Sequence, residues 1–187
     1  MTDLDIEMRR GRSLAETARE VLAARADSLA RETAEEESAH RVALLLFRIG
    51  EEWYTVRVSD VREIFQEYEI TNIPCVPDFV LGVVNVRGEI LSITDPAKLM
   101  RIGIVDASGL VPPPAIVIAG GGVATALVVD EIGDIAEVAS DGIEPPVSII
   151  DRVQAEYIAG SVYIEGAMVG LINIERMLEP VVAGSRH

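Results

Sequence analysis

The segment FVLGVVNVRGEILSITD, which runs from Phe79 to Asp95, decides the fold of this 187-residue chain. Two runs rich in Val and Ile flank Arg87 and Gly88, and this pattern predicts a strand, a tight turn and a second strand. Gly82 interrupts the first run, as glycine does at a bulge or where a second backbone approaches closely. Arg87 is therefore expected on a rigid β framework, where its planar guanidinium can organise carboxylates or backbone carbonyls. On spacing alone, an arginine that merely caps the turn is the simpler interpretation.

Short runs of the same kind recur after residue 41 and predict a chain built mainly of short strands. The expected strands cover residues 42–49, 53–58, 80–86, 90–94, 115–119, 123–129, 132–138, 161–164 and 168–174. Glycine-containing turns at residues 50–52 and 120–122 stand at similar places, and each is followed by a strand that leads into an acidic segment. The chain is therefore predicted to be internally duplicated as two small barrels, with short helices at residues 95–101 and 174–178.

The first 40 residues have a different periodicity, which predicts an amphipathic helical extension. Residues 13–37 contain neither Pro nor Gly, and Leu14, Ala18 and Leu22 fall on one helical face. Ser13 and Glu16 have the spacing of a capping box. The predicted organisation is a helical extension over residues 1–40, a β domain over residues 41–180 and a flexible tail over residues 181–187. Three interpretations of the helix stay open: packing on its own domain, docking to a partner helix, and self-association.

Composition excludes several classes of protein. Sixteen basic and 31 acidic residues give a formal net charge of −15, which disfavours nucleic acid and anionic lipid as partners. Cys75 is the single cysteine, so no intramolecular disulfide is expected. No signal peptide and no apolar run of membrane-spanning length stand out. A cytoplasmic location without direct membrane insertion is the resulting prediction.

The residues that usually carry chemistry are sparse or poorly placed. His40 and His187 are far apart in the sequence and the cysteine is alone, so no metal site is predicted. The glycines at residues 120–122 lack the lysine of a phosphate-binding loop and predict a hairpin turn. Acidic pairs at residues 51–52 and 130–131 are typical of solvated turns. The sequence therefore predicts no catalytic residue, no cofactor and no metal, which leaves binding as the function.

The order of these blocks resembles the CheW family of chemotaxis coupling proteins. The resemblance rests on Asn85 to Gly88, followed by Val128 to Asp130 and by Ile132 to Ile135, and it covers residues 42–178. It implies two SH3-like, five-stranded β-barrels that share a hydrophobic junction. It also implies a non-enzymatic adaptor that couples chemoreceptors to a histidine kinase in signalling arrays.

The resemblance assigns roles to individual residues. Those expected at the receptor are Val61, Glu63, Arg87, Ile132 and Ile135. Those expected at the kinase lie in or near the turn from residue 68 to residue 77 and are Tyr68, Ile70, Ile73 and Gly82. Simpler interpretations stay open for several of them: an exposed helix carboxylate for Glu63, core packing for the apolar side chains, and a purely structural need for Gly82.

The partners implied are the regulatory domain of a chemotaxis histidine kinase and the cytoplasmic tip of a chemoreceptor. Leu81 stands where family members can have lysine, and Ser92 stands where they can have proline. These departures leave the partner's identity open. Two alternative functions remain at this point: a small-molecule-binding β-barrel, and a scaffold of a related chemosensory pathway that does not serve motility.

Overall fold

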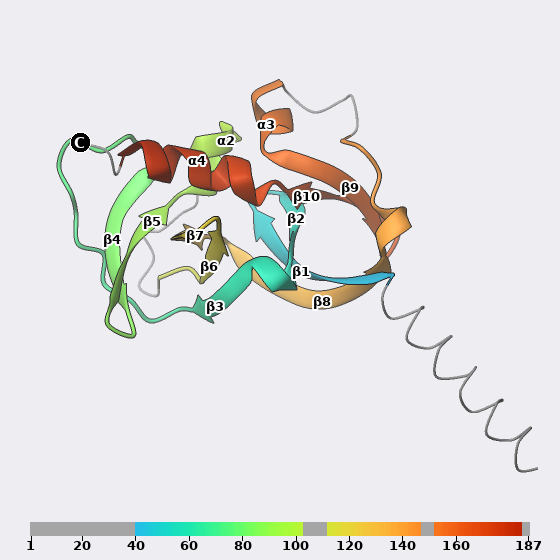
Figure 1. Ribbon diagram of the computed structural model, residues 1–187, viewed down its shortest axis with the longest axis horizontal. Helices are drawn as coiled ribbons and strands as arrows, with labels where there is room; N and C mark the ends of the chain where they lie inside the picture. Colours follow the sequence, from blue (N-terminus) through green and yellow to red (C-terminus); the bar gives the residue numbers. More distant parts are fainter. Residues whose placement is uncertain (1–39, 103–111, 147–151, 185–187) are drawn as a thin grey trace, which may run out of the picture. The chain divides into compact units, whose positions relative to one another are not determined.

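The computed structural model describes residues 40–102, 112–146 and 152–184 (Figure 1). The chain divides into two compact units, residues 1–41 and 42–187. The second unit is mainly β and contains two five-stranded sheets. Sheet A has the strand order β8-β1-β2-β10-β9, with bounds β1 (Arg41–Ile49), β2 (Glu52–Arg57), β8 (Glu131–Ala139), β9 (Ile158–Ile164) and β10 (Ala167–Ile172). Sheet B has the order β3-β6-β7-β5-β4, with bounds β3 (Val61–Phe65), β4 (Val80–Val86), β5 (Glu89–Thr94), β6 (Ala115–Gly120) and β7 (Val123–Val128).

The chain is duplicated as predicted, but the two halves exchange strands, so that each sheet contains strands from both halves. Each sheet combines a hairpin from one half of the chain with three strands from the other half: β1–β2 join β8, β9 and β10, and β6–β7 join β3, β4 and β5. In both sheets the second strand of the hairpin pairs in parallel with the last strand of the other half, β2 with β10 and β7 with β5. Strand β3 therefore leaves the hairpin that precedes it and crosses to the other sheet (Figure 1).

Matching turns mark the equivalent positions of the two halves. Arg87 and Gly88, between β4 and β5, have φ angles of 51° and 90°. Glu165 and Gly166, between β9 and β10, have φ angles of 49° and 88°. Two consecutive positive φ values in a two-residue loop are typical of the type I′ turn, whose twist suits a β-hairpin. The predicted strand, turn and strand around Arg87 are confirmed, and the second half repeats them with a glutamate in place of the arginine.

Capped helices follow the last strand of each half. Asp95 precedes α2 (Pro96–Met100), and its Oδ1 accepts hydrogen bonds from the backbone N–H groups of Ala97, at 2.9 Å, and Lys98, at 3.2 Å. Asn173 precedes α4 (Ile174–Gly184), and its Oδ1 accepts from the N–H of Arg176 at 3.2 Å. Both caps satisfy donors that the first turn of a helix leaves without partners. The other helical elements in the described residues are α3 (Arg152–Glu156) and the 3₁₀ turns η1 (Val58–Asp60) and η2 (Ser140–Gly142).

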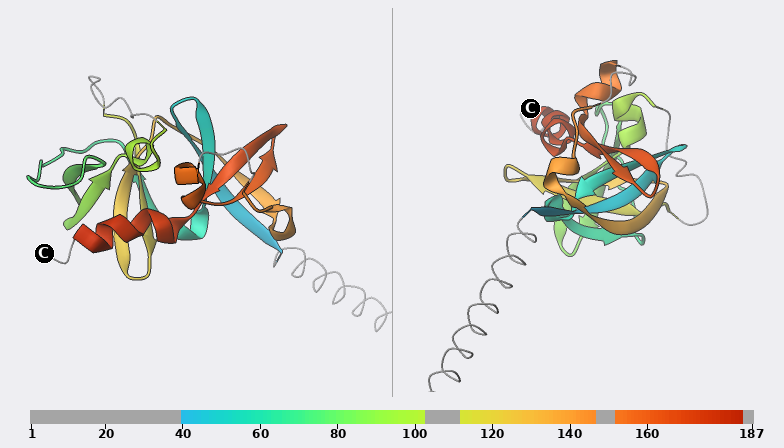
Figure 2. Two further views of the ribbon diagram at one scale, coloured as in Figure 1. Left: turned by 90° about the horizontal axis from the view of Figure 1, so that it is seen from above. Right: turned by 90° about the vertical axis from the view of Figure 1, so that its right-hand side faces the viewer.

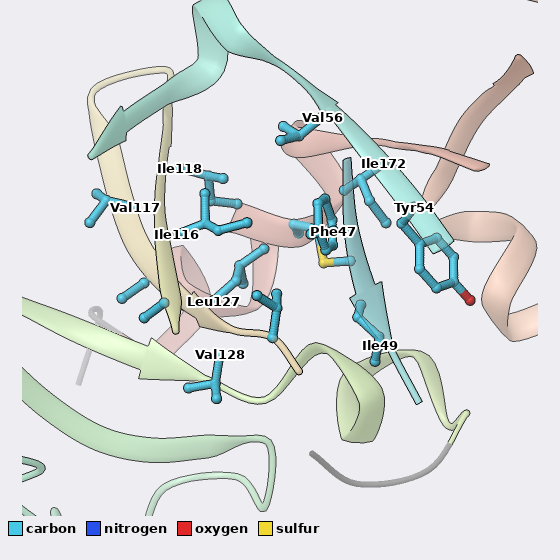
Figure 3. Packing of buried hydrophobic residues seen from close by; sticks show 14 of the residues in the cluster. Phe47, Ile49, Tyr54, Val56, Ile116, Val117, Ile118, Leu127, Val128 and Ile172 are labelled. Carbon is cyan, nitrogen blue, oxygen red and sulfur yellow. The ribbon is translucent and has the colours of Figure 1, made fainter. Parts of the chain in front are cut away.

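A buried cluster of apolar side chains joins the two sheets. Phe47 and Tyr54 of sheet A pack in the same cluster as Ile116 and Leu127 of sheet B (Figure 3). A second, smaller cluster lies on sheet A and contains Leu44, Val162, Ile164, Val169 and Leu171. Helix α4 contacts β6 and β7, so the helix that ends the second half covers sheet B (Figure 2).

Several elements differ from the predictions. Residues 61–65 form strand β3, so the interpretation of Glu63 as a helix carboxylate is wrong. Helix α4 continues through Pro180 to Gly184, past the predicted end at residue 178 and into the predicted tail. Proline removes one backbone hydrogen bond from a helix, and burial of Ile174, Met177 and Leu178 against the core offsets that loss. Helix α3 was not predicted. The predicted N-terminal helix and residues 185–187 lie outside the described residues.

Candidate functional site

Arg87 pairs with Glu63 across a gap between two outer strands of sheet B. Its Nε and Nη2 atoms both lie 2.8 Å from Glu63 Oε1. The Arg87 side chain is 83% exposed and that of Glu63 is 26% exposed. Asn85 Oδ1 accepts a 2.8 Å hydrogen bond from the Gly88 N–H and so fixes the turn that carries the arginine. The structure therefore brings together two of the predicted receptor residues.

A second ion pair, which the sequence analysis did not identify, lies beside the first. Arg62 donates two hydrogen bonds to Glu89, from Nη1 to Oε1 at 3.2 Å and from Nη2 to Oε2 at 2.6 Å. These hydrogen bonds lower the pKa of the Glu89 carboxyl and raise the pKa of the Arg62 guanidinium. The sequence does contain two short segments that each carry one positive and one negative charge, Arg62 with Glu63 and Arg87 with Glu89. Only the structure shows that these two segments meet.

A pocket of about 320 Å³ lies between these charged groups. Its lining combines the four charged side chains with the apolar Val86, Leu91 and Val117. Leu91 and Val117 are buried, whereas Arg62 and Arg87 are exposed. The pocket therefore has buried apolar residues at its base and both positive and negative charges at its rim. Such a surface suits an apolar side chain that is flanked by charged residues.

The three apolar residues predicted at the receptor lie apart from this pocket's lining. Val61 and Ile132 are partly buried and pack against the cluster that joins the sheets. Ile135 lies on β8 of sheet A and is 59% exposed. Of these three, Ile135 is the side chain that a partner could reach without rearrangement.

The residues predicted at the kinase have unequal exposure. Tyr68 donates a 2.7 Å hydrogen bond to the carbonyl oxygen of Pro113, and its ring meets the edge of Phe65 at a centroid distance of 5.2 Å. Burial raises the pKa of the Tyr68 hydroxyl. Ile70 is partly buried, and Ile73 is 40% exposed.

Gly82 is buried beneath the backbone of the segment that carries these residues. A Cβ atom placed on Gly82 would lie 2.4 Å from the carbonyl oxygen of Thr71 and 2.8 Å from Ile70 Cγ2. Thr71 forms a two-way backbone hydrogen bond with Val83, at 2.8 and 2.9 Å. Gly82 thus has a structural role as the place where the segment crosses β4.

Several exposed apolar side chains escaped the sequence analysis. Ile64 and Ile90 are 44% and 63% exposed, and they lie on β3 and β5. Tyr163 and Met168 face each other across β9 and β10 and are 67% and 52% exposed. The alternation of side chains along a strand could have placed these four residues on an outer face. Only the structure shows that, among the described residues, they stay exposed.

The described residues offer neither a metal-binding cluster nor a membrane-spanning helix. No group of three or more His, Cys, Asp and Glu residues in this part of the chain is arranged to hold a metal ion. Among the helices described, none combines the length and the apolar character needed to cross a bilayer.

The duplicated β scaffold and its charged pocket define a binding module, and comparison with known proteins identifies its family. The sequence-family model that describes the CheW-like domain matches residues 43–181 of the chain. The chain is 33% identical to the chemotaxis protein CheW of Rhizobium meliloti over 132 residues, which cover 71% of this chain and 84% of the relative. It is 30% identical to the chemotaxis protein CheW of Klebsiella aerogenes over 135 residues, which cover 72% and 80% of the two chains. The solved structure of the scaffolding protein TtCheW from Thermoanaerobacter tengcongensis superposes with a TM-score of 0.67 at 26% identity and covers 74% of this chain and 92% of that one.

The chain belongs to the CheW family of chemotaxis coupling proteins. It is accordingly an adaptor that couples chemoreceptors to a histidine kinase. The resemblance noted in the sequence is confirmed.

Proposed function

We propose that the pocket between β3 and the β4–β5 hairpin receives the cytoplasmic tip of a chemoreceptor. The observation that carries this proposal is the Glu63–Arg87 pair at the rim of a pocket lined by Val86 and Leu91. An amphipathic helix presents apolar side chains at helical spacing, with charged residues at their flanks. One such apolar side chain would enter the pocket, and the flanking charges would meet the rim.

The rim pair is suited to exchange its partners. The Arg87 side chain is largely exposed, and an exposed ion pair contributes little to stability, so breaking it costs little. A receptor carboxylate could then accept two parallel hydrogen bonds from the Arg87 guanidinium, and a receptor cation could approach Glu63. Charge-assisted hydrogen bonds of this kind are strong and directional, and they would set the register of the receptor helix.

We further propose that the segment from Tyr68 to Pro77 meets the regulatory domain of the kinase. Ile73 is the most exposed of its candidate apolar contacts, and the backbone bridge from Thr71 to Val83 fastens the segment to β4. The residues that line the receptor pocket do not belong to this segment. Two partners could therefore bind at the same time, as an adaptor requires.

Each five-stranded sheet would be an SH3-like barrel, and the protein would catalyse no reaction. It would act at membrane-associated receptor arrays because its receptor partners are held there. Residues 1–40 would support self-association. Membership of the CheW family favours this adaptor role over the small-molecule-binding alternative.

Titration of the full chain against each partner separately tests the two faces. The probes are a two-helix hairpin covering the cytoplasmic tip of a chemoreceptor and the regulatory domain of a chemotaxis kinase, both encoded in the same genome. Arg87→Ala is expected to weaken hairpin binding about tenfold, and Ile73→Ser to weaken only kinase binding. Arg176→Ala is the matched control because Arg176 is also an exposed, ion-paired arginine, 2.9 Å from Glu179. Equal effects of the two arginine variants would contradict the proposed receptor site.

A further inference from the structure

A β-bulge explains how two adjacent residues of β3 reach the same hairpin. Val61 faces Ile118 of β6, and Glu63 faces Val117, so two steps along β3 match a single step along β6. Arg62 is the extra residue of this bulge. In a regular strand Arg62 and Glu63 would point to opposite faces of the sheet. A bulge re-aims side chains locally, and here both residues line one pocket.

The strands that these residues connect are held to one another by side chains. In sheet B, β3 and β4 are the two outer strands, and no ladder within the described residues joins them. Arg62 reaches Glu89 at the start of β5, and Glu63 reaches Arg87 in the preceding turn. The two ion pairs therefore span the gap between β3 and the β4–β5 hairpin.

Across the gap, the pattern of charges permits only one pairing of opposite charges among the four groups. Both strand ends carry one positive and one negative side chain, so the observed pairs place opposite charges together. A shift of the hairpin that brought Arg62 to Arg87, or Glu63 to Glu89, would place like charges in contact, which is unfavourable. Arg62–Glu89 is the bidentate pair, with hydrogen bonds to both carboxylate oxygens, whereas both nitrogens of Arg87 approach a single oxygen of Glu63.

We propose that Arg62 and Glu89 form a positioning pair that holds the β4–β5 hairpin against β3 and thereby presents Arg87 and Glu63 to the receptor. The two pairs then have different roles. Glu63–Arg87 exchanges its partners on binding, whereas Arg62–Glu89 stays intact and keeps the pocket in shape. This inference rests on the proposed receptor site for its functional consequence, but the geometry that it describes can be tested without a receptor.

Charge-swap variants of the full chain separate the two roles. The first series changes the positioning pair, here called the brace, and consists of Arg62→Glu, Glu89→Arg and the double variant. The second, matched series changes the pair proposed to contact the receptor and consists of Glu63→Arg, Arg87→Glu and the double variant. The first readout is the nuclear magnetic resonance signal of the Arg87 Nε–H group, which donates to Glu63. The second is the affinity for the receptor-tip hairpin, and the third is the melting temperature.

Each single reversal in the brace series is expected to abolish the protected Arg87 Nε–H signal and to weaken hairpin binding about five- to tenfold. Melting temperatures should stay within about 2 °C of the parent because exposed pairs contribute little to stability. The Arg62→Glu/Glu89→Arg double variant should restore the signal and bring affinity back to within about twofold. The double variant of the contact series should fold and still fail to bind, because the receptor would then meet inverted charges.

Two results would overturn the positioning role. One is an Arg87 Nε–H signal that the single brace reversals leave unchanged. The other is a brace double variant that regains the signal without regaining affinity, because Arg62 or Glu89 would then touch the receptor directly. Failure of the parent chain to bind the hairpin would contradict the proposed receptor site alone, and the Arg87 signal would still decide whether the brace positions that residue.

Discussion

Gly82 and Gly160 occupy equivalent positions in β4 and β9. At each glycine another segment of the chain crosses the strand, and a backbone carbonyl of that segment lies against the glycine. A Cβ on Gly82 would lie 2.4 Å from the oxygen of Thr71, and one on Gly160 would lie 2.7 Å from that of Glu144. In both halves the crossing residue forms two backbone hydrogen bonds with the residue that follows the glycine. Thr71 and Val83 are joined at 2.8 and 2.9 Å, and Glu144 and Ser161 are joined by two bonds of 2.8 Å. A side chain would push the crossing segment away in either half.

Alanine at Gly82 is expected to displace the segment that carries Ile70 and Ile73 and to destabilise the fold by about 2–3 kcal/mol. The cost includes backbone strain because Gly82 has a φ of 145°. Kinase binding should weaken beyond what the loss of folded protein explains. Gly160→Ala is the matched control, since it disturbs the other half and should destabilise the fold while sparing kinase binding. Thermal unfolding and titration with the regulatory domain measure both effects. Identical losses of kinase affinity in the two variants would show that the position of the segment on β4 does not matter.

A buried group of hydroxyls between β5 and β7 gives a second prediction. Thr125 Oγ1 donates to the carbonyl oxygen of Ser92 at 3.0 Å, and it lies 2.8 Å from Ser92 Oγ and 3.2 Å from Thr94 Oγ1. Within the described residues, every buried side-chain nitrogen and oxygen has a hydrogen-bond partner. Thr125→Val would remove the shared partner and should cost about 1–3 kcal/mol in denaturant unfolding. Thr125→Ser keeps the hydroxyl and is expected to cost less, so an equal loss would assign the effect to packing.

The cap of α2 allows a test of the duplication itself. Asp95 is 1% exposed and accepts two backbone hydrogen bonds, and Asn173 caps α4 by accepting one with its amide oxygen. Asp95→Ala should destabilise the fold by about 1–2 kcal/mol because a capping acceptor is lost. Asp95→Asn should retain more than half of that stability, as the equivalent position already uses asparagine. Equilibrium unfolding of both variants measures the difference, and an Asn variant as unstable as the Ala variant would refute the equivalence.

Lowering the pH should weaken the Arg62–Glu89 ion pair that joins β3 to β5. The pKa of Glu89 is lower in the folded chain than its ordinary value because Arg62 donates hydrogen bonds to it. The contribution of the pair is therefore complete above the ordinary glutamate pKa and is lost as pH falls through the lowered value. Carboxyl carbon chemical shifts followed over pH should show this, and Arg62→Gln should return the Glu89 pKa towards its ordinary value. Arg176→Gln, which removes a distant arginine, should leave it unchanged, and a Glu89 midpoint that ignores Arg62→Gln would contradict the pairing.

The sequence predicted local structure well because local structure follows local patterns. The runs that contain Val84 and Ile93 are rich in Val and Ile, as strands are, and the turn at Arg87 and Gly88 has the expected geometry. The exchange of strands between sheets was not predictable, since it depends on which strands pair over a long distance. Strand β3 escaped prediction because apolar and polar residues do not alternate in its sequence, in which Arg62 and Glu63 are adjacent. The bulge between Val61 and Glu63 is a long-range feature that the sequence does not reveal.

The candidate site was predictable only in part. Arg87 and Glu63 were identified through family resemblance, and the structure joins them at 2.8 Å. Arg62 and Glu89 lie 27 positions apart, and nothing in their local sequence connects them. Gly82 was given two interpretations, and its close approach to Thr71 reveals a structural need that a lone glycine in a strand could only suggest.

The adaptor role is tested most directly by asking whether one chain holds both partners at once. The full chain, the receptor-tip hairpin and the kinase regulatory domain would be mixed, and the mass of the complexes would be measured by light scattering after gel filtration. The account predicts a ternary complex that Arg87→Ala reduces to the pair of adaptor and kinase domain. Competition between the two partners, or binding of neither by a folded chain, would contradict it.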